Sequence, residues 1–258
     1  MDRTLSPPLE PEARVVRAYI LSAGLGTRLY PITDKTPKVM LPIGQRPLLW
    51  YQIKLASFYG FDEIIVNLHK NAKKVSDYFG DGKDLQVKIL YAYEKKLLGT
   101  AGSVKRAQNF FDKQTFLVLY GDTFRNTNLK KLCNFHLRKK GICTILLYQT
   151  DEPWTQGIIE INKNNQVLSF VEKPKRGKER SNLSNAGVLI CEPKIFDYIQ
   201  PDKFSDFGAD VLPNLAKIER VFAVKTGDYT QDIGTPEHYQ KAQDDFAKGK
   251  IKFPFKID

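Results

Sequence analysis

Short apolar runs and helix-spaced apolar residues alternate along the first half of the chain. The runs are rich in β-branched residues, which is typical of buried strands, and the segments between them place apolar residues on one helical face. The predicted strands are 15–21, 63–68, 86–92, 114–120 and 142–149. The predicted helices are 47–58, 72–79, 99–110 and 128–140. This alternation predicts an α/β fold with a doubly wound, mostly parallel mixed sheet.

The second half follows a different pattern. Two short apolar runs flank Asn164-Asn165, which predicts a hairpin. Thr235 followed by Pro236 has the form of an N-cap and first helical residue, and predicts a final helix that ends near 246. The other predicted elements are strands at 188–190 and 220–224 and helices at 193–199 and 207–216.

No internal repeat or low-complexity linker divides the chain. We therefore expect a single domain over residues 15–258. Residues 1–14 combine prolines with charges, and we expect them to form a flexible extension before the first strand.

The composition is that of an ordinary globular protein, with 42% hydrophobic and 27% charged residues in 258. No apolar run approaches the roughly 20 residues of a membrane span, and the first segment lacks the apolar centre of a secretory signal. Cys133, Cys143 and Cys191 lie far apart and form no CxxC pair, so we expect them to be buried and reduced. These features predict a cytoplasmic protein without a membrane partner.

The formal net charge of +11 favours anionic partners such as nucleotides, sugar phosphates or nucleic acid. The basic residues are scattered among turns and helix ends, which indicates solvated faces rather than a nucleic-acid footprint. We expect no nucleic-acid partner. A nucleic-acid-binding module, suggested by the basic charge, nevertheless stays as an alternative to an enzyme.

A loop rich in glycine and basic residues follows the first predicted strand, from 21 to 42 (LSAGLGTRLYPITDKTPKVMLP). Glycines let the backbone approach a ligand, and backbone N–H groups can point at phosphate oxygens. Leu29 stands where a dinucleotide fingerprint would need its third glycine, and the Gly-Lys-Ser/Thr of a P-loop is absent. Gly24 and Gly26 alone fit a structural turn equally well. Together with Arg28 and Lys38 they indicate a polyphosphate site.

The string A-G-x-G-T-R, followed by T-P-K, resembles the opening signature of the sugar-1-phosphate nucleotidyltransferases. The resemblance extends from about residue 16 to 246 and implies a Rossmann-like, GT-A-like nucleotidyltransferase fold. It implies a nucleoside triphosphate and a sugar 1-phosphate as substrates, Mg²⁺ as cofactor, and a nucleotide sugar and pyrophosphate as products. We expect no β-helix or acyltransferase domain after the final helix, and a homo-oligomer stays open.

Nucleotidyl transfer brings two polyanions together, so the protein must neutralise charge and align the reactants. Mg²⁺ suits this task and is usually held by one or two carboxylates and several waters. Asp122 follows a predicted strand, and Asp232 precedes the final helix. Either aspartate alone is typical of such positions. The resemblance implies that both bind the metal, and the strand order predicts that Asp122 and the glycine loop share one sheet edge.

The resemblance also implies roles for the cationic residues. Arg28 would contact the leaving pyrophosphate through a forked set of donors, and Lys38 would neutralise charge at the α-phosphate. Arg28, Lys38 and Asp122 form the expected catalytic set. The expected nucleotide-binding residues are Leu21, Ala23, Gly24, Gly26, Thr27, Glu94, Gly99 and Thr100.

Glu94 begins the string Glu-x-x-x-Leu-Gly-Thr-Ala-Gly, which resembles the base-binding region of the guanylyl-transferring branch. A carboxylate can accept both Watson–Crick-edge donors of guanine, N1–H and N2–H₂, whereas uracil and thymine offer one donor. That branch contains mannose-1-phosphate and heptose-1-phosphate guanylyltransferases. An exposed Glu94 without contact to a base is the alternative.

Four further residues are expected to bind the sugar phosphate. Gly157 would allow close approach of the sugar, and Glu172 would accept from its hydroxyls. Lys173 would hold the phosphate and Asn185 the hexose, although the VEKP string alone also fits an exposed charged turn. Gln156 stands where the family often has tyrosine or phenylalanine, which leaves the identity of the sugar open.

The favoured reaction is transfer from GTP to mannose 1-phosphate. A heptose-1-phosphate guanylyltransferase is second, and a glucose-1-phosphate thymidylyl- or uridylyltransferase third. A catalytically silent subunit that binds nucleotide sugars is the alternative of another class. The presence of Arg28, Lys38, Asp122 and Asp232 counts against it.

Overall fold

The computed structural model describes residues 17–218 and 220–257, so the predicted extension at 1–14 lies outside the described residues. Within them, nine strands form one sheet in the order β10-β9-β11-β6-β1-β4-β5, with β8 paired to β11 and β12 paired to β8. These strands are β1 (Arg17–Leu21), β4 (Glu63–Leu68), β5 (Lys88–Tyr93), β6 (Phe116–Tyr120), β8 (Cys143–Gln149), β9 (Gly157–Ile161), β10 (Val167–Glu172), β11 (Leu183–Cys191) and β12 (Val221–Lys225).

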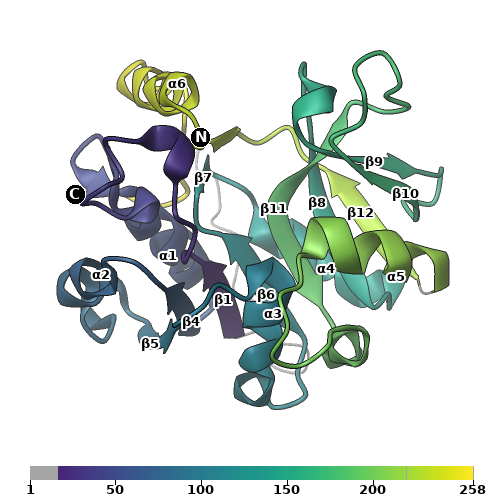
Figure 1. The fold of residues 1–258 in the computed structure, drawn as a ribbon, viewed down its shortest axis with the longest axis horizontal. Helices are drawn as coiled ribbons and strands as arrows, with labels where there is room; N and C mark the ends of the chain where they lie inside the picture. Colours follow the sequence, from purple (N-terminus) through teal and green to yellow (C-terminus); the bar gives the residue numbers. More distant parts are fainter. Residues whose placement is uncertain (1–16, 219, 258) are drawn as a thin grey trace, which may run out of the picture.

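Helices lie on both sides of this sheet (Figure 1). Two short two-stranded ribbons are separate from it. The helices are α1 (Leu48–Phe58), α2 (Ala72–Phe79), α3 (Gly99–Arg106), α4 (Leu129–Lys139), α5 (Leu212–Ile218) and α6 (Pro236–Ala247). The ribbons pair β2 (Pro42–Ile43) with β3 (Arg46–Pro47), and β7 (Thr123–Arg125) with β13 (Thr230–Asp232).

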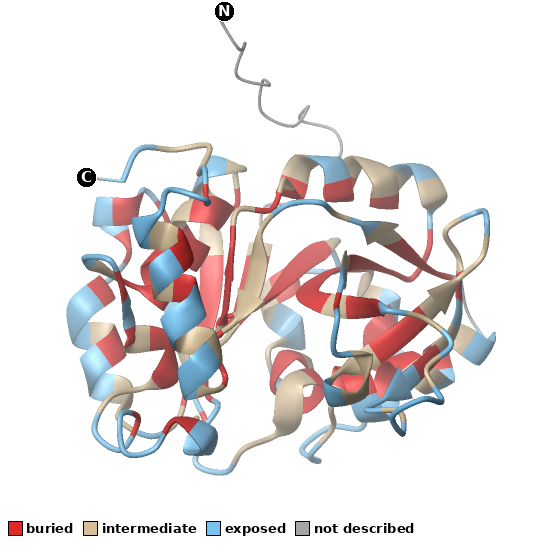
Figure 2. Ribbon diagram, turned by 90° about the horizontal axis from the view of Figure 1, so that it is seen from above, coloured by how far each residue is buried: buried red, intermediate tan, exposed pale blue. Residues whose placement is uncertain are grey.

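Strands β6, β1, β4 and β5 run parallel. Strands β1, β4 and β6 are buried on both faces, whereas the edge strand β5 keeps exposed residues. Ala18 and Ile20 of β1 pack in a core that includes α1, whereas Tyr19 points to a second core that includes α3. Figure 2 shows buried residues running through the strands while the helices keep exposed outer sides. Burial on both faces explains why these strands are nearly continuous apolar runs. The predicted doubly wound, mixed α/β sheet is confirmed.

Strand β11 joins this parallel part to the rest of the sheet through antiparallel pairs with β6, β8 and β9. The predicted hairpin is present as β9 and β10, and Asn165 in its turn has φ 63°. Strand β11 begins at Leu183, five residues before the predicted start at 188. The sequence did not indicate this earlier part because Ser184 and Asn185 interrupt its apolar pattern. Both side chains line a cavity, so their polarity reflects the site rather than a loop.

Several helices differ from the sequence prediction. The predicted helix 193–199 is a 3₁₀ helix (Pro193–Tyr198), and the helix 99–110 ends at Arg106 before a 3₁₀ turn (Gln108–Phe111). The predicted helix 207–216 begins as one π-helical segment (Phe207–Val211) and continues as α5. Pro213 has no N–H for the usual bond to the preceding turn, which favours a wider turn there.

Helix α6 lies beside the segment that follows the glycine loop, although the two are far apart in sequence (Figure 1). The Tyr239 hydroxyl donates to the Pro42 carbonyl at 2.7 Å. Thr235 caps the helix by accepting from the His238 N–H, as its sequence position predicts. Among the described residues, no helix combines the length and apolar character needed to cross a membrane.

Candidate functional site

The carboxyl ends of β1 and β6 meet at one edge of the sheet. Leu21 pairs with Tyr120 in the parallel ladder, and the Gly121 N–H donates to the Leu21 carbonyl at 2.9 Å. A Cβ on Gly121 would lie 2.8 Å from that same carbonyl oxygen, so the approach requires glycine. The glycine loop and Asp122 therefore open on the same edge, as the sequence predicts.

The β7–β13 ribbon brings Asp232 to this edge from far along the chain. Asp232 pairs with Thr123, the residue next to Asp122, and the Ile233 N–H donates to the Asp122 carbonyl at 3.2 Å. The backbone pairing thus places both aspartates side by side.

Lys38 lies between the two carboxylates. Its Nζ is 2.9 Å from Asp122 Oδ2 and 3.6 Å from Asp232 Oδ2. The Lys38 side chain is 9% exposed, whereas those of Asp122 and Asp232 are 36% and 34% exposed. Burial lowers the pKa of Lys38, but the two carboxylates outweigh it and the pKa is raised overall. The ammonium is therefore charged, and both aspartates keep a side open to solvent.

Arg28 reaches the same point from the glycine loop. A Cβ on Gly234 would lie 2.5 Å from Asp232 Oδ1, 2.7 Å from Arg28 Nη2 and 3.2 Å from Lys38 Nζ. Burial raises the pKa of Asp232, but the neighbouring His238, the charges of Lys38 and Arg28 and a hydrogen bond from the Gly234 N–H at 2.8 Å lower it overall. The structure thus brings the two predicted cations and the two predicted carboxylates together around Gly234.

The donor set of this cluster fits Mg²⁺. Magnesium prefers oxygen ligands and usually keeps several waters, with one or two carboxylates from the protein. No group of three or more His, Cys, Asp or Glu side chains suited to a metal occurs within 17–218 and 220–257. Asp122 and Asp232 would therefore supply the protein ligands, and phosphate oxygens and waters the remainder. The ammonium of Lys38 between the carboxylates shows that the site accommodates positive charge.

Two cavities, of about 460 Å³ and about 180 Å³, adjoin this cluster and share Tyr120, Asp122 and Asp206 in their walls. Of the predicted nucleotide-binding residues, six line the smaller cavity: Leu21, Ala23, Gly24, Glu94, Gly99 and Thr100. Gly26 and Thr27 are not among its lining residues. Gly26 has φ 63° and precedes a 3₁₀ turn (Thr27–Leu29), so these two residues shape the loop.

Glu94 is 5% exposed, so the alternative of a surface residue is wrong. Its Oε1 accepts from Asn67 Nδ2 at 2.7 Å, and its Oε2 accepts from the Leu98 N–H at 3.1 Å. Asn67 Oδ1 in turn accepts from the Ser22 N–H at 2.5 Å. The carboxylate therefore links β4, the glycine loop and the start of α3 at the wall of the smaller cavity.

Three of the four predicted sugar-phosphate residues, Gly157, Glu172 and Asn185, line the larger cavity. A Cβ on Gly157 would lie 2.7 Å from Glu172 Oε2, so glycine keeps this wall open. Lys173 differs from its neighbours: it is exposed, has φ 45°, and is not among the residues that line the cavity.

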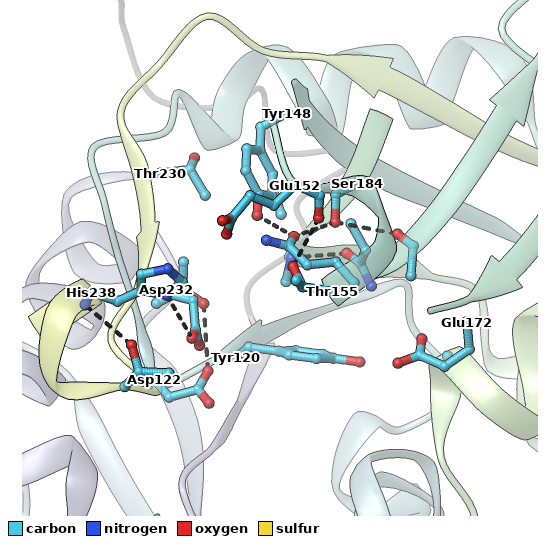
Figure 3. Close-up of a pocket in the computed structure, with 18 of the residues that line it drawn as sticks. Tyr120, Asp122, Tyr148, Glu152, Thr155, Glu172, Ser184, Thr230, Asp232 and His238 are labelled. Atoms are coloured by element: carbon cyan, nitrogen blue, oxygen red, sulfur yellow. Dashed lines mark hydrogen bonds and ion pairs between the residues drawn. The ribbon is translucent and has the colours of Figure 1, made fainter. Parts of the chain in front are cut away.

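The larger cavity also contains residues that no sequence pattern indicated. Gln156 Oε1 accepts from the hydroxyls of Tyr148 and Ser184, the latter at 2.6 Å. Figure 3 shows Asp122, Asp232 and His238 gathered on one side of this cavity and Glu172 on the other. His238 Nδ1 is 3.9 Å from Asp232 Oδ1, and this neighbour raises the pKa of the imidazole. Of these additional residues, the sequence drew attention only to Gln156, which stands where the family often has tyrosine or phenylalanine.

Comparisons with known proteins agree with this geometry. Residues 17–249 match the family described as nucleotidyl transferase. The chain is 35% identical over 240 residues to UTP–glucose-1-phosphate uridylyltransferase of Synechocystis, covering 87% of this chain and 62% of that protein. It is 31% identical over 227 residues to mannose-1-phosphate guanylyltransferase catalytic subunit beta of Dictyostelium discoideum, with the same two coverages. The chain thus spans about three fifths of the length of each of these relatives.

A solved structure of similar length supports the same relation. HddC from Yersinia pseudotuberculosis superimposes with a TM-score of 0.77 at 31% identity, covering 90% of this chain and 99% of that protein. HddC has also been solved complexed with GMP-PN.

Proposed function

The chain belongs to the nucleotidyl transferase family, and from this premise we propose that it transfers a nucleotidyl group from a nucleoside triphosphate to a sugar 1-phosphate. The products are a nucleotide sugar and pyrophosphate. One observation carries the proposal: Arg28, Lys38, Asp122 and Asp232 converge where the two cavities meet. A smaller cavity walled by the glycine loop suits the nucleoside, and a larger one with hydroxyl, amide and carboxylate groups suits a sugar.

In this reaction a phosphate oxygen of the sugar 1-phosphate attacks the α-phosphorus, and the bond to the pyrophosphate oxygen breaks. The attacking oxygen is already ionised, so no general base is needed. Lys38 offsets the charge that develops around the α-phosphorus, and Arg28 holds the leaving pyrophosphate. Mg²⁺ held by Asp122 and Asp232 would supply further positive charge at the phosphate oxygens.

Gly157, Glu172 and Asn185 orient the sugar, and Lys173 approaches the sugar phosphate from the rim. Lys173 is exposed and does not line the cavity in the structure. Its role requires the side chain to extend toward the cavity when the phosphate is bound.

GTP with mannose 1-phosphate is the favoured substrate pair. The buried carboxylate of Glu94 at the smaller cavity supports guanine, since it can accept two donors from the base edge. A mannose-1-phosphate guanylyltransferase among the relatives and GMP-PN bound to HddC support the same pair. The uridylyltransferase relative keeps UTP with glucose 1-phosphate as the second candidate.

The direct test is a matrix of four nucleoside triphosphates against sugar 1-phosphates, read by pyrophosphate release in the presence of Mg²⁺. We expect GTP with mannose 1-phosphate to give the highest kcat/KM. A higher value for UTP with glucose 1-phosphate would overturn the substrate pair but not the reaction. Absence of pyrophosphate release in every cell, with nucleotide sugars still binding, would instead indicate a silent regulatory subunit.

A further inference from the structure

Phe204 is a large apolar side chain that stands 67% exposed at the wall of the smaller cavity. Apolar surface left in water becomes more stable when another apolar surface covers it. Other apolar atoms of the same wall belong to Leu21, Ala23 and Leu97. The cavity therefore has an apolar rim in addition to its polar groups.

The backbone fixes the place of this side chain. The Ser205 N–H donates to the Leu98 carbonyl at 2.9 Å, and the Ser205 carbonyl accepts from Ala101 N–H at 2.9 Å and Gly102 N–H at 3.0 Å. These three bonds attach the segment to the first turn of α3. Phe204 is thus held at the cavity by the adjacent residue rather than by its own packing.

Gly99 lets the segment approach this closely. A Cβ on Gly99 would lie 2.4 Å from the Ser205 carbonyl oxygen and 3.3 Å from Phe204 Cε2, and Gly99 has φ 75°. On the glycine loop, a Cβ on Gly24 would meet no atom within 4 Å. The cavity is therefore open above the glycine loop and bordered by an aromatic ring next to Gly99.

We propose that Phe204 packs against the nucleobase and raises the affinity for nucleoside triphosphates whatever their base. The inference rests on the proposed function, which assigns the smaller cavity to the nucleoside. Every base has an apolar face that can contact an aromatic ring, so this contact does not distinguish guanine from uracil. Glu94 would select the base by its edge, and Phe204 would bind it by its face.

The test compares Phe204→Ala with Phe204→Trp. Loss of a base–aromatic contact should raise the Kd for GTP and for UTP by a similar factor of about ten, while Phe204→Trp keeps both near the wild-type value. The Kd is measured by calorimetry with each nucleotide alone, and KM for the sugar 1-phosphate should not change. Leu168→Ala is the matched control, because Leu168 is 60% exposed on β10 and lines neither cavity.

Unchanged nucleotide affinity in Phe204→Ala, with a wild-type protein that releases pyrophosphate, would overturn this inference alone. A loss confined to GTP would also overturn it, since the contact would then select a base. A wild-type protein that neither binds nucleotides nor releases pyrophosphate would overturn the proposed function and the inference together. Matching thermal midpoints of the two Phe204 variants and wild type exclude misfolding as the cause of a loss.

Discussion

Lys38 is the residue that connects the sequence motif to the geometry of the candidate site. A buried ammonium is costly unless opposite charges compensate it. Here Asp122 and Asp232 both lie within 4.0 Å of Nζ. These three residues and Arg28 could be predicted because each stands in a short string that resembles a signature of the nucleotidyltransferase family.

Three polar residues of the larger cavity were harder to predict than Gly157, Glu172 and Asn185. Tyr148, Gln156 and Ser184 come from β8, a loop and β11, and they meet only through the antiparallel pairing of those strands. Tyr148 and Ser184 are ordinary polar residues in their local sequences, and Gln156 was noticed only as a departure from the tyrosine or phenylalanine common in the family. Phe204 was missed because exposure cannot be read from residue type.

Asp122→Asn should lower kcat by roughly a hundredfold or more, because it removes one negative charge from the metal site and from Lys38. Pyrophosphate release at saturating substrates measures the effect. Asp84→Asn is the control, since Asp84 is an exposed aspartate away from both cavities. Near-normal turnover of the Asp122 variant would contradict a metal-binding role.

Glu94→Gln should reduce the preference for GTP over UTP. An amide in place of the carboxylate keeps one acceptor and adds a donor, which conflicts with the guanine N1–H and N2–H₂ groups or with Asn67 and Leu98. The ratio of kcat/KM for the two nucleotides measures the change. An equal loss for both nucleotides would show that Glu94 only braces the cavity wall.

At the scale of elements, the β7–β13 ribbon and helix α6 decide where Asp232 lies. Asp245 of α6 accepts from Tyr229, the residue before β13, and from Lys241 and Lys250 at 2.7 and 2.6 Å. Burial opposes the charged form of this carboxylate, but Lys241, Lys250 and Tyr229 lower its pKa to about 2. Helix α6 is thus anchored by an ion cluster in which the Asp245 carboxylate is buried and both lysines are more than half exposed.

Asp245→Asn should destabilise the protein by about 2 kcal/mol at pH 7, since the pKa falls from about 4 in the unfolded chain to about 2. A depressed pKa contributes stability above pH 4, and this contribution disappears as the pH falls toward 2. The difference from wild type in urea unfolding should therefore shrink over that range. Asp244→Asn, a neighbouring exposed aspartate, is the control. A difference that is constant with pH would contradict the ion cluster as its source.

The elements themselves differed in how well sequence predicted them. Strands buried on both faces, such as β4 over Glu63–Leu68, have bounds that match the prediction because burial imposes a continuous apolar run. The two- and three-residue strands β2, β3, β7 and β13 are too short for any periodicity. The ribbon that completes the site was therefore outside the reach of pattern analysis.

At the scale of the whole molecule, the net charge of +11 contrasts with the acidic walls of the larger cavity. Glu152, Glu172 and Asp206 line this cavity together with Asp122 and Asp232, against the guanidinium of Arg28 and the imidazole of His238. A sugar 1-phosphate therefore enters a cavity whose own charge opposes it. Binding of the sugar 1-phosphate should therefore depend on the metal and on the cationic residues at the edge of the larger cavity.

Removing divalent metal with a chelator should stop turnover and leave the thermal midpoint nearly unchanged. Lys38 pairs with both aspartates, Arg28 lies beside Asp232, and both carboxylates are about one third exposed, so loss of the metal leaves no unpaired buried charge. Pyrophosphate release and differential scanning fluorimetry, before and after adding back Mg²⁺, measure the two effects. Turnover that persists in chelator would contradict the metal requirement, and a large fall in midpoint would contradict the compensation by Lys38.

The pairing of β7 with β13 also has a consequence for synthesis of the chain. Contacts between such distant segments form late, because a long loop must close first. On a translating ribosome, Lys38 would have one acidic partner until residues 230–232 leave the exit tunnel. Nascent copies would thus lack a complete metal site, and catalytic competence would appear only late in translation.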